Sequence, residues 1–135
     1  MSDIIKIYVD GGCKRNGGTD PQSYGSLAVE YQGEIKRRMT QDFPQVRTSN
    51  QAEYGALLMA MSYVDNLKAR TQNLLPPIEI LTDSQLVYRQ LVGNFKIKSA
   101  NLKKLHAAAR DWMQHDPSVT LDKVERSVVE AVLGH

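Results

Sequence analysis

The chain has 135 residues, of which 41% are hydrophobic and 24% charged, as is typical of a globular protein. Its one cysteine, Cys13, excludes an internal disulfide framework and a zinc site made from several cysteines. The formal net charge of +2 does not by itself indicate a nucleic-acid binder. The sequence shows neither a leader-like start nor an apolar run of membrane-spanning length. We therefore expect one domain over residues 1–135, no membrane partner and, by elimination, a cytoplasmic location.

Three strands are predicted in the first third of the chain. Residues 4–10 form a β-rich run that ends in an acid and is followed by two glycines. Residues 24–31 and 34–40 are two further runs, and the Gln32-Gly33 pair between them is typical of a tight hairpin. These patterns predict an antiparallel meander.

A long helix and a buried strand come next. From Ser49 onward, apolar side chains recur every three or four residues, which predicts an amphipathic helix. Its apolar stripe consists of Tyr54, Leu57, Leu58, Met61 and Val64. Residues 68–77 are expected to be a loop, and the apolar run 78–82 a strand buried on both faces.

The last third of the chain predicts three helices and one strand. One short helix should follow Ser84 and end at Gly93, and Ser99 should cap another. Residues 118–124 are expected to form the last strand, and Ser127 to cap a last short helix. The element order predicts an α/β fold in which helices pack on a mixed sheet.

Three acids stand at the ends of predicted elements. Asp10 and Asp83 each end an apolar strand, and a helical wheel places Glu53 about 20° outside the edge of the apolar stripe. Alternatively, Glu53 is a boundary residue favoured by the helix N-terminus, and Asp83 caps the following helix. Carboxylates that lie close together repel one another, and a bound Mg²⁺ or Mn²⁺ ion usually neutralises their charge. The pattern therefore predicts a divalent-metal site.

Three motifs carry a resemblance to a known family. They are Asp10-Gly11-Gly12-Cys13-x-x-Asn16-Gly17 followed by Tyr24-Gly25, Thr48-x-Asn50-Gln51-Ala52-Glu53-Tyr54, and Thr82-Asp83-Ser84-Gln85-Leu86-Val87. In order and spacing the chain resembles type 1 ribonuclease H over essentially its whole length. The resemblance implies a ribonuclease H-like fold with a five-stranded mixed sheet, in which strands one to three form the meander and strands one, four and five are parallel.

The resemblance also implies an activity, namely hydrolysis of the RNA strand of an RNA–DNA hybrid. Two Mg²⁺ or Mn²⁺ ions about 4 Å apart would be expected. On this interpretation Asp10 bridges the ions, while Glu53 and Asp83 each ligate on one side.

Substrate contacts are implied for small and polar residues of the same motifs. Amide side chains suit sugar and minor-groove contacts because they both donate and accept hydrogen bonds. Turn and cap roles are the alternative for Asn16 and Asn50. The expected contacts are Gly11, Gly12, Cys13, Asn16, Asn50, Gln51, Ser84 and Gln85.

The C-terminal segment departs from the family pattern. Type 1 ribonucleases H usually carry a fourth acid after a segment like Val124-Glu125-Arg126, but ungapped alignment places Leu133 at that position. Two substitutes remain open, His135 and Glu130. The helical wheel favours His135 as a catalytic and metal-binding group, and an imidazole would shift the metal preference towards manganese.

Two other functions compete with hybrid cleavage. The chain could be a catalytically impaired module that binds hybrids or double-stranded RNA, or a nuclease that also cuts double-stranded RNA. A pure binder would gain nothing from three negative charges beside phosphate, which favours the enzyme. We expect a monomer.

Overall fold

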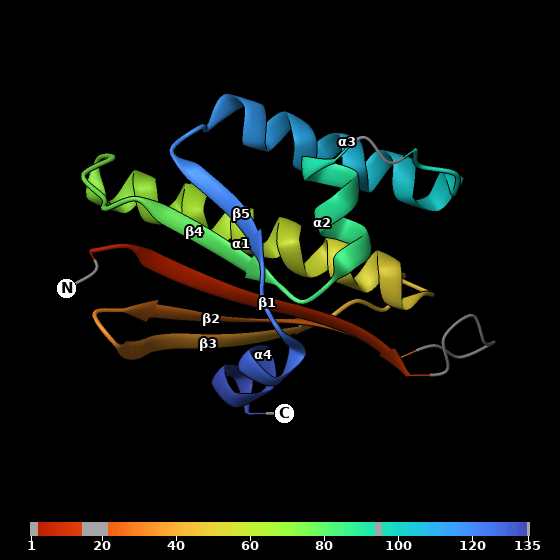
Figure 1. Ribbon diagram of the computed structural model, residues 1–135, viewed down its shortest axis with the longest axis horizontal. Coiled ribbons are helices and arrows are strands. Elements are labelled where there is room, and N and C mark those ends of the chain that lie inside the picture. Colours follow the sequence, from red (N-terminus) through yellow and green to blue (C-terminus); the bar gives the residue numbers. More distant parts are fainter. Residues whose placement is uncertain (1–2, 15–21, 94–95, 135) are drawn as a thin grey trace.

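The computed structural model describes residues 3–14, 22–93 and 96–134 (Figure 1). Within these ranges the chain forms one five-stranded sheet and four helices. The strands are β1 (Ile5–Lys14), β2 (Gln22–Tyr31), β3 (Glu34–Asp42), β4 (Ile78–Thr82) and β5 (Val119–Lys123), and the helices are α1 (Ser49–Thr71), α2 (Gln85–Val92), α3 (Ala100–His115) and α4 (Arg126–Leu133).

The sheet has the strand order β3-β2-β1-β4-β5. β1 pairs with β2 and β2 with β3 in antiparallel fashion, whereas β1–β4 and β4–β5 are parallel pairs. This arrangement confirms the predicted mixed sheet. In the tight turn between β2 and β3, both Gln32 and Gly33 have positive φ angles, as the hairpin prediction requires.

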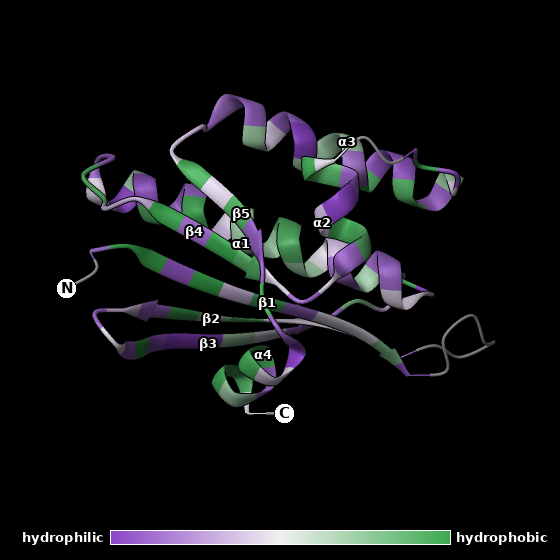
Figure 2. Cartoon of the chain, viewed as in Figure 1, coloured by the Kyte–Doolittle hydropathy of each residue, from purple (hydrophilic) through white to green (hydrophobic). Residues whose placement is uncertain are grey.

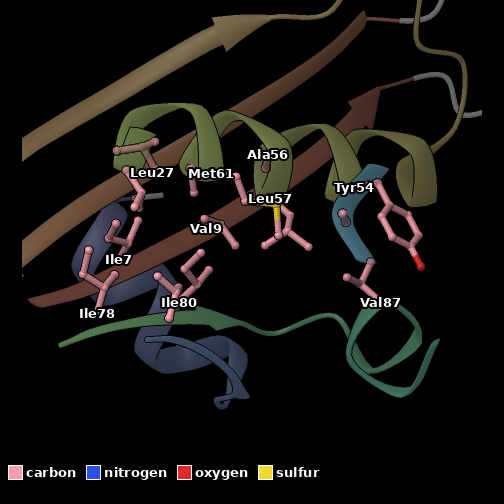
Figure 3. Close-up of a cluster of buried hydrophobic side chains, with 14 of the residues drawn as sticks. Ile7, Val9, Leu27, Tyr54, Ala56, Leu57, Met61, Ile78, Ile80 and Val87 are labelled. Atoms are coloured by element: carbon pink, nitrogen blue, oxygen red, sulfur yellow. The ribbon is translucent and has the colours of Figure 1, made fainter. Parts of the chain in front are cut away.

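The main core lies between α1 and the central strands (Figure 3). Alternate residues of β1, such as Ile7 and Val9, face Leu57 and other residues of the α1 stripe. Each large aliphatic side chain that leaves water in this way contributes roughly 1.5–3 kcal/mol. The predicted stripe is confirmed, although Leu58 is only partly buried.

Helix α4 stands apart from the other three helices, beside β2 and β3 (Figure 1). Its Val129 is buried but lies outside the main core, as do Tyr8 of β1 and Ala28 of β2, which are register partners. Successive strand residues point to opposite faces, so α4 covers the face of the sheet opposite α1. Strand β3 is mostly hydrophilic and exposed, as suits an edge strand (Figure 2).

Several boundaries differ from the sequence prediction. β2 begins at Gln22, β3 ends at Asp42 and β5 covers Val119–Lys123, each a shift of one or two residues. Three differences are larger or bear on the site. β1 continues past Asp10 to Lys14, because its last residues pair with the start of β2. α1 runs on to Thr71, where Gln72 takes a left-handed conformation and ends it. α4 begins at Arg126 with Glu125 as N-cap, not at Ser127. No helix in the described ranges is both long and apolar enough to cross a membrane.

Candidate active site

The register of β1 and β4 places two of the predicted acids side by side. The last parallel pair joins Val9 to Thr82, and Asp10 and Asp83 are the residues that follow. Neighbouring strands lie about 4.8 Å apart, so the two acids occupy adjacent positions on β1 and just after β4. Asp10 is 8% exposed.

Asp83 does not cap the helix that follows it. The N-cap of α2 is Ser84, whose hydroxyl accepts a hydrogen bond from the Val87 N–H at 3.1 Å. The Asp83 carboxylate is therefore not needed for helix capping, which removes that alternative for this acid.

Glu53 is brought to the site by a close approach of α1 to β1. A Cβ added to Gly11 would lie 2.1 Å from the Ala52 carbonyl oxygen, so only glycine admits the helix at this distance. Burial raises the pKa of Glu53, a hydrogen bond with Ser84 lowers it, and the charges of Asp83 and Asp10 raise it further, with a net rise. Carboxyl groups from three distant segments thus influence one another.

A positive charge also belongs to this cluster. Arg126, the first residue of α4, places its Nη1 atom 3.4 Å from Asp83 Oδ2 and its Nε atom 3.0 Å from Glu130 Oε1. The negative charges of Asp83 and then Asp10 raise the pKa of Arg126 above its ordinary value. Glu130, considered from sequence as a substitute fourth acid, is bound to this arginine.

Tyr24 of β2 completes the surroundings of Asp10. It is the register partner of Gly12, and a Cβ on Gly12 would lie 2.6 Å from the Tyr24 ring. Burial is the main cause of a raised Tyr24 pKa, and the charge of Asp10 and a hydrogen bond with that carboxylate add to it. The phenol therefore stays protonated and donates to Asp10.

The carboxylates are the right type of ligand for a hard divalent cation, but their arrangement does not form a complete binding site. Carboxylate oxygens are the ligands that Mg²⁺ and Mn²⁺ prefer. Among the described residues, however, no three His, Cys, Asp or Glu side chains are gathered so that they could hold a metal ion. Asp83 is instead paired with Arg126. As they stand, the side chains do not form a complete metal site.

The first-motif residues predicted to contact substrate also serve the fold. Gly11 and Gly12 make room for the α1 backbone and for the Tyr24 ring. The Cys13 thiol donates weakly to the backbone oxygens of Lys14 and Arg47, each at 3.5 Å. Asn16 lies outside the described residues, as does His135.

Of the other predicted contacts, Asn50 and Gln85 are exposed, whereas Ser84 is buried. Asn50 lines a cavity of about 250 Å³ at the start of α1. The Gln51 side chain accepts from the N–H groups of Arg47 and Thr48 and so belongs to the helix cap. Ser84 caps α2, and Gln85 lies beside the guanidinium of Arg89.

Sequence reasoning gave no role to Tyr24 or Arg126, although both lie in segments that match the family. No charge or periodicity signal marks them, because their partners come from other strands. Only the pairing of β1 with β2 and of β4 with β5 brings these side chains to the acids.

Residues 9–132 match the model of a protein family described as reverse transcriptase-like. The chain belongs to this family. The chain is 30% identical over 136 residues to Ribonuclease HI of Halobacterium salinarum. The alignment covers 95% of the chain and 64% of the relative. The chain therefore spans somewhat less than two thirds of the length of that curated relative.

Solved structures agree with the family assignment. RNase H1 from Halobacterium salinarum NRC-1 is 25% identical, with a TM-score of 0.80 over 96% of this chain and 91% of that one. LC11-RNase H1, isolated from compost, was solved in complex with an RNA/DNA hybrid. In that complex it is 24% identical, with a TM-score of 0.78 over 95% of this chain and 90% of the other, and it shows the same fold. The resemblance to type 1 ribonuclease H is confirmed.

Proposed function

We propose that this chain is an endoribonuclease that hydrolyses the RNA strand of RNA–DNA hybrids. The observation that carries the proposal is the meeting of Asp10, Glu53 and Asp83, one from each of three family motifs, at one edge of the sheet. The Ribonuclease HI relative and the hybrid bound to LC11-RNase H1 support the reaction and its substrate.

Asp10, Glu53 and Asp83 would hold divalent cations in this enzyme. Two Mg²⁺ or Mn²⁺ ions would supply an activated water and stabilise the leaving oxygen. His135 rather than Glu130 would be the fourth ligand, since Arg126 contacts Glu130 at 3.0 Å and Asp83 only at 3.4 Å.

The chain's own groups prepare the site for this reaction. Tyr24 donates to Asp10 and keeps its carboxylate in place, and Ser84 does the same for Glu53. The low exposure of Asp10 and of the Asp83 side chain strengthens their interaction with any bound cation, because little water competes. Asn50, exposed at the start of α1, is free to meet the sugar–phosphate backbone of a substrate.

Digestion of a labelled RNA–DNA hybrid with Mg²⁺ and with Mn²⁺ tests the proposal. We expect the wild-type protein to cut the RNA strand, and Asp10→Asn to lower the rate by about 100-fold or more, the scale of losing a preorganised charge. Asp122→Asn, which changes an exposed acid of β5, should retain activity. Intact hybrid after incubation with the folded wild-type protein and either metal would refute the proposal. Parallel digestion of an RNA duplex tests whether double-stranded RNA is also a substrate.

A further inference from the structure

Arg126 is placed between two acids that belong to different elements. Its guanidinium contacts Asp83, at the end of β4, and Glu130, one turn further along α4. The side chain of Asp83 is only 7% exposed, whereas that of Arg126 is 70% exposed. A nearly buried carboxylate is thus neutralised by a cation that approaches from the solvent side.

The backbone fixes this placement. β5 lies parallel to β4, and beyond their last register pair the Val124 N–H donates to the Thr82 carbonyl at 2.9 Å. The chain therefore passes directly beside Asp83 before α4 begins at Arg126. The arginine reaches the acid because of strand pairing, and no movement of a helix is needed.

The contact with Asp83 is the weaker of the two that Arg126 makes. At 3.4 Å it is long for a charge-assisted hydrogen bond, whereas the contact with Glu130 is 3.0 Å and joins residues one helical turn apart. An exposed guanidinium at this distance is held loosely. It can leave Asp83 and keep Glu130 as its partner.

We propose that Arg126 is a displaceable counter-ion that competes with a divalent cation for Asp83 and is retained by Glu130 when the cation binds. This inference rests on the proposed function, because it takes Asp83 to be a metal ligand. The arginine holds Asp83 in the metal-free protein, and a doubly charged ion offers that carboxylate a stronger attraction.

Calorimetric titration with Mn²⁺ tests the competition without any measurement of activity. Arg126→Gln should bind Mn²⁺ about fivefold more tightly than wild type, the change expected when a weak competing ion pair is removed. The matched control is Lys123→Gln, which removes an equal charge from an exposed residue of the neighbouring strand end. It should change the affinity by less than about twofold. Thermal unfolding with and without Mn²⁺ should show a larger metal-induced stabilisation for Arg126→Gln.

Three outcomes would overturn the competition between Arg126 and the cation. An equal gain in Mn²⁺ affinity in Lys123→Gln and Arg126→Gln would show a general effect of net charge and overturn the proposal. An unchanged Mn²⁺ affinity in Arg126→Gln would also overturn it. Absence of Mn²⁺ binding in both wild type and Arg126→Gln would overturn it as well. Hybrid digestion by the same wild-type preparation separates the two proposals: cleavage with no affinity change on loss of Arg126 rejects only the competition. Far-UV circular dichroism should confirm that Arg126→Gln is folded, since this side chain is mostly exposed.

Discussion

Asp10 depends on its neighbours as much as on its own place in β1. Tyr24 donates to its carboxylate from β2, and Arg126 contributes positive charge from α4. A buried carboxylate without such partners would lose several kcal/mol of hydration, of order 1–3 kcal/mol for each hydrogen bond left unmade. The phenol of Tyr24 is therefore expected to matter for the site although it is not a metal ligand.

Tyr24→Phe should lower kcat on the hybrid about fivefold and leave the fold intact. The change removes one hydrogen bond worth about 1 kcal/mol from the Asp10 carboxylate and keeps the ring that packs over Gly12. Steady-state kinetics, together with Mn²⁺ affinity by calorimetry, would measure the effect.

Tyr31→Phe, at the other end of β2, is the control for the loss of a phenol hydroxyl. If Tyr24→Phe and Tyr31→Phe had the same kcat and the same Mn²⁺ affinity, Tyr24 would have no positioning role.

At the scale of elements, the site depends on how closely α1 can approach β1. The helix backbone at Ala52 stands where a side chain of residue 11 would be, and Glu53 is the next residue of that helix. Any change that pushes α1 outward displaces Glu53 from the neighbourhood of Asp10 and Asp83. Packing of the helix and geometry of the acids are therefore coupled.

Gly11→Ala should destabilise the protein by about 3 kcal/mol and abolish most of the activity, because the added methyl group overlaps backbone that cannot rotate away. Urea unfolding followed by circular dichroism gives the free energy of unfolding. Gly33→Ala is the matched control, since nothing lies within 4 Å of its added Cβ and only its positive φ opposes alanine. That control should lose about 1 kcal/mol. Equal losses in the two variants would contradict the close approach.

Element types and their order could be predicted from the chain, because periodicity reports which face of an element is buried. The α1 stripe and the nearly all-apolar run of β4 are examples, and both are confirmed. The extension of β1 through Gly11 to Lys14 could not be predicted in this way. Glycines normally indicate a turn, and the pairing with β2 that keeps them in a strand is a long-range contact.

The same limit applies to the site. Asp10, Glu53 and Asp83 stand out because each ends or begins an element beside small polar residues. Arg126 does not, since its pairing with Asp83 depends on β4 and β5 lying side by side. A local pattern identifies acids that need a partner, but it does not identify the partner.

At the scale of the whole molecule, an ion pair stabilises the packing of two helices at the end of the sheet remote from the acids. Lys68 of α1 contacts Asp116, the C-cap residue of α3, just before β5. Burial alone would raise the pKa of Asp116, but hydrogen bonds from Lys68 and Ser118 and the charge of Lys68 outweigh it, so the pKa lies below its usual value. This contact joins α1 to the end of α3, just before β5 begins.

The stability that this pair contributes should disappear in acid. A carboxyl group whose pKa is lowered in the folded state stabilises the fold above its unfolded pKa, and the contribution is lost as the pH falls through the folded pKa. Asp116→Asn should therefore cost about 1 kcal/mol at pH 7 and nearly nothing near pH 2. Urea unfolding at both pH values measures the difference.

Asp111→Asn, on the exposed side of α3, is the control and should show no such dependence. An equal loss of stability for Asp116→Asn at both pH values would exclude the ion pair as its cause.

The parallel pairing of β1 with β4 also constrains which insertions and deletions the gene can tolerate. Side chains alternate between the two faces of β1, and Asp10 follows a run of register pairs from Ile5 to Val9. Loss of one codon within that run would turn Asp10 towards α1 and bring Gly11, which has no side chain, to its place. Loss of two codons would restore the face but shift the acid by about 7 Å along the strand. In-frame length changes in this strand should therefore be eliminated by selection even where the remaining side chains could still fill the core.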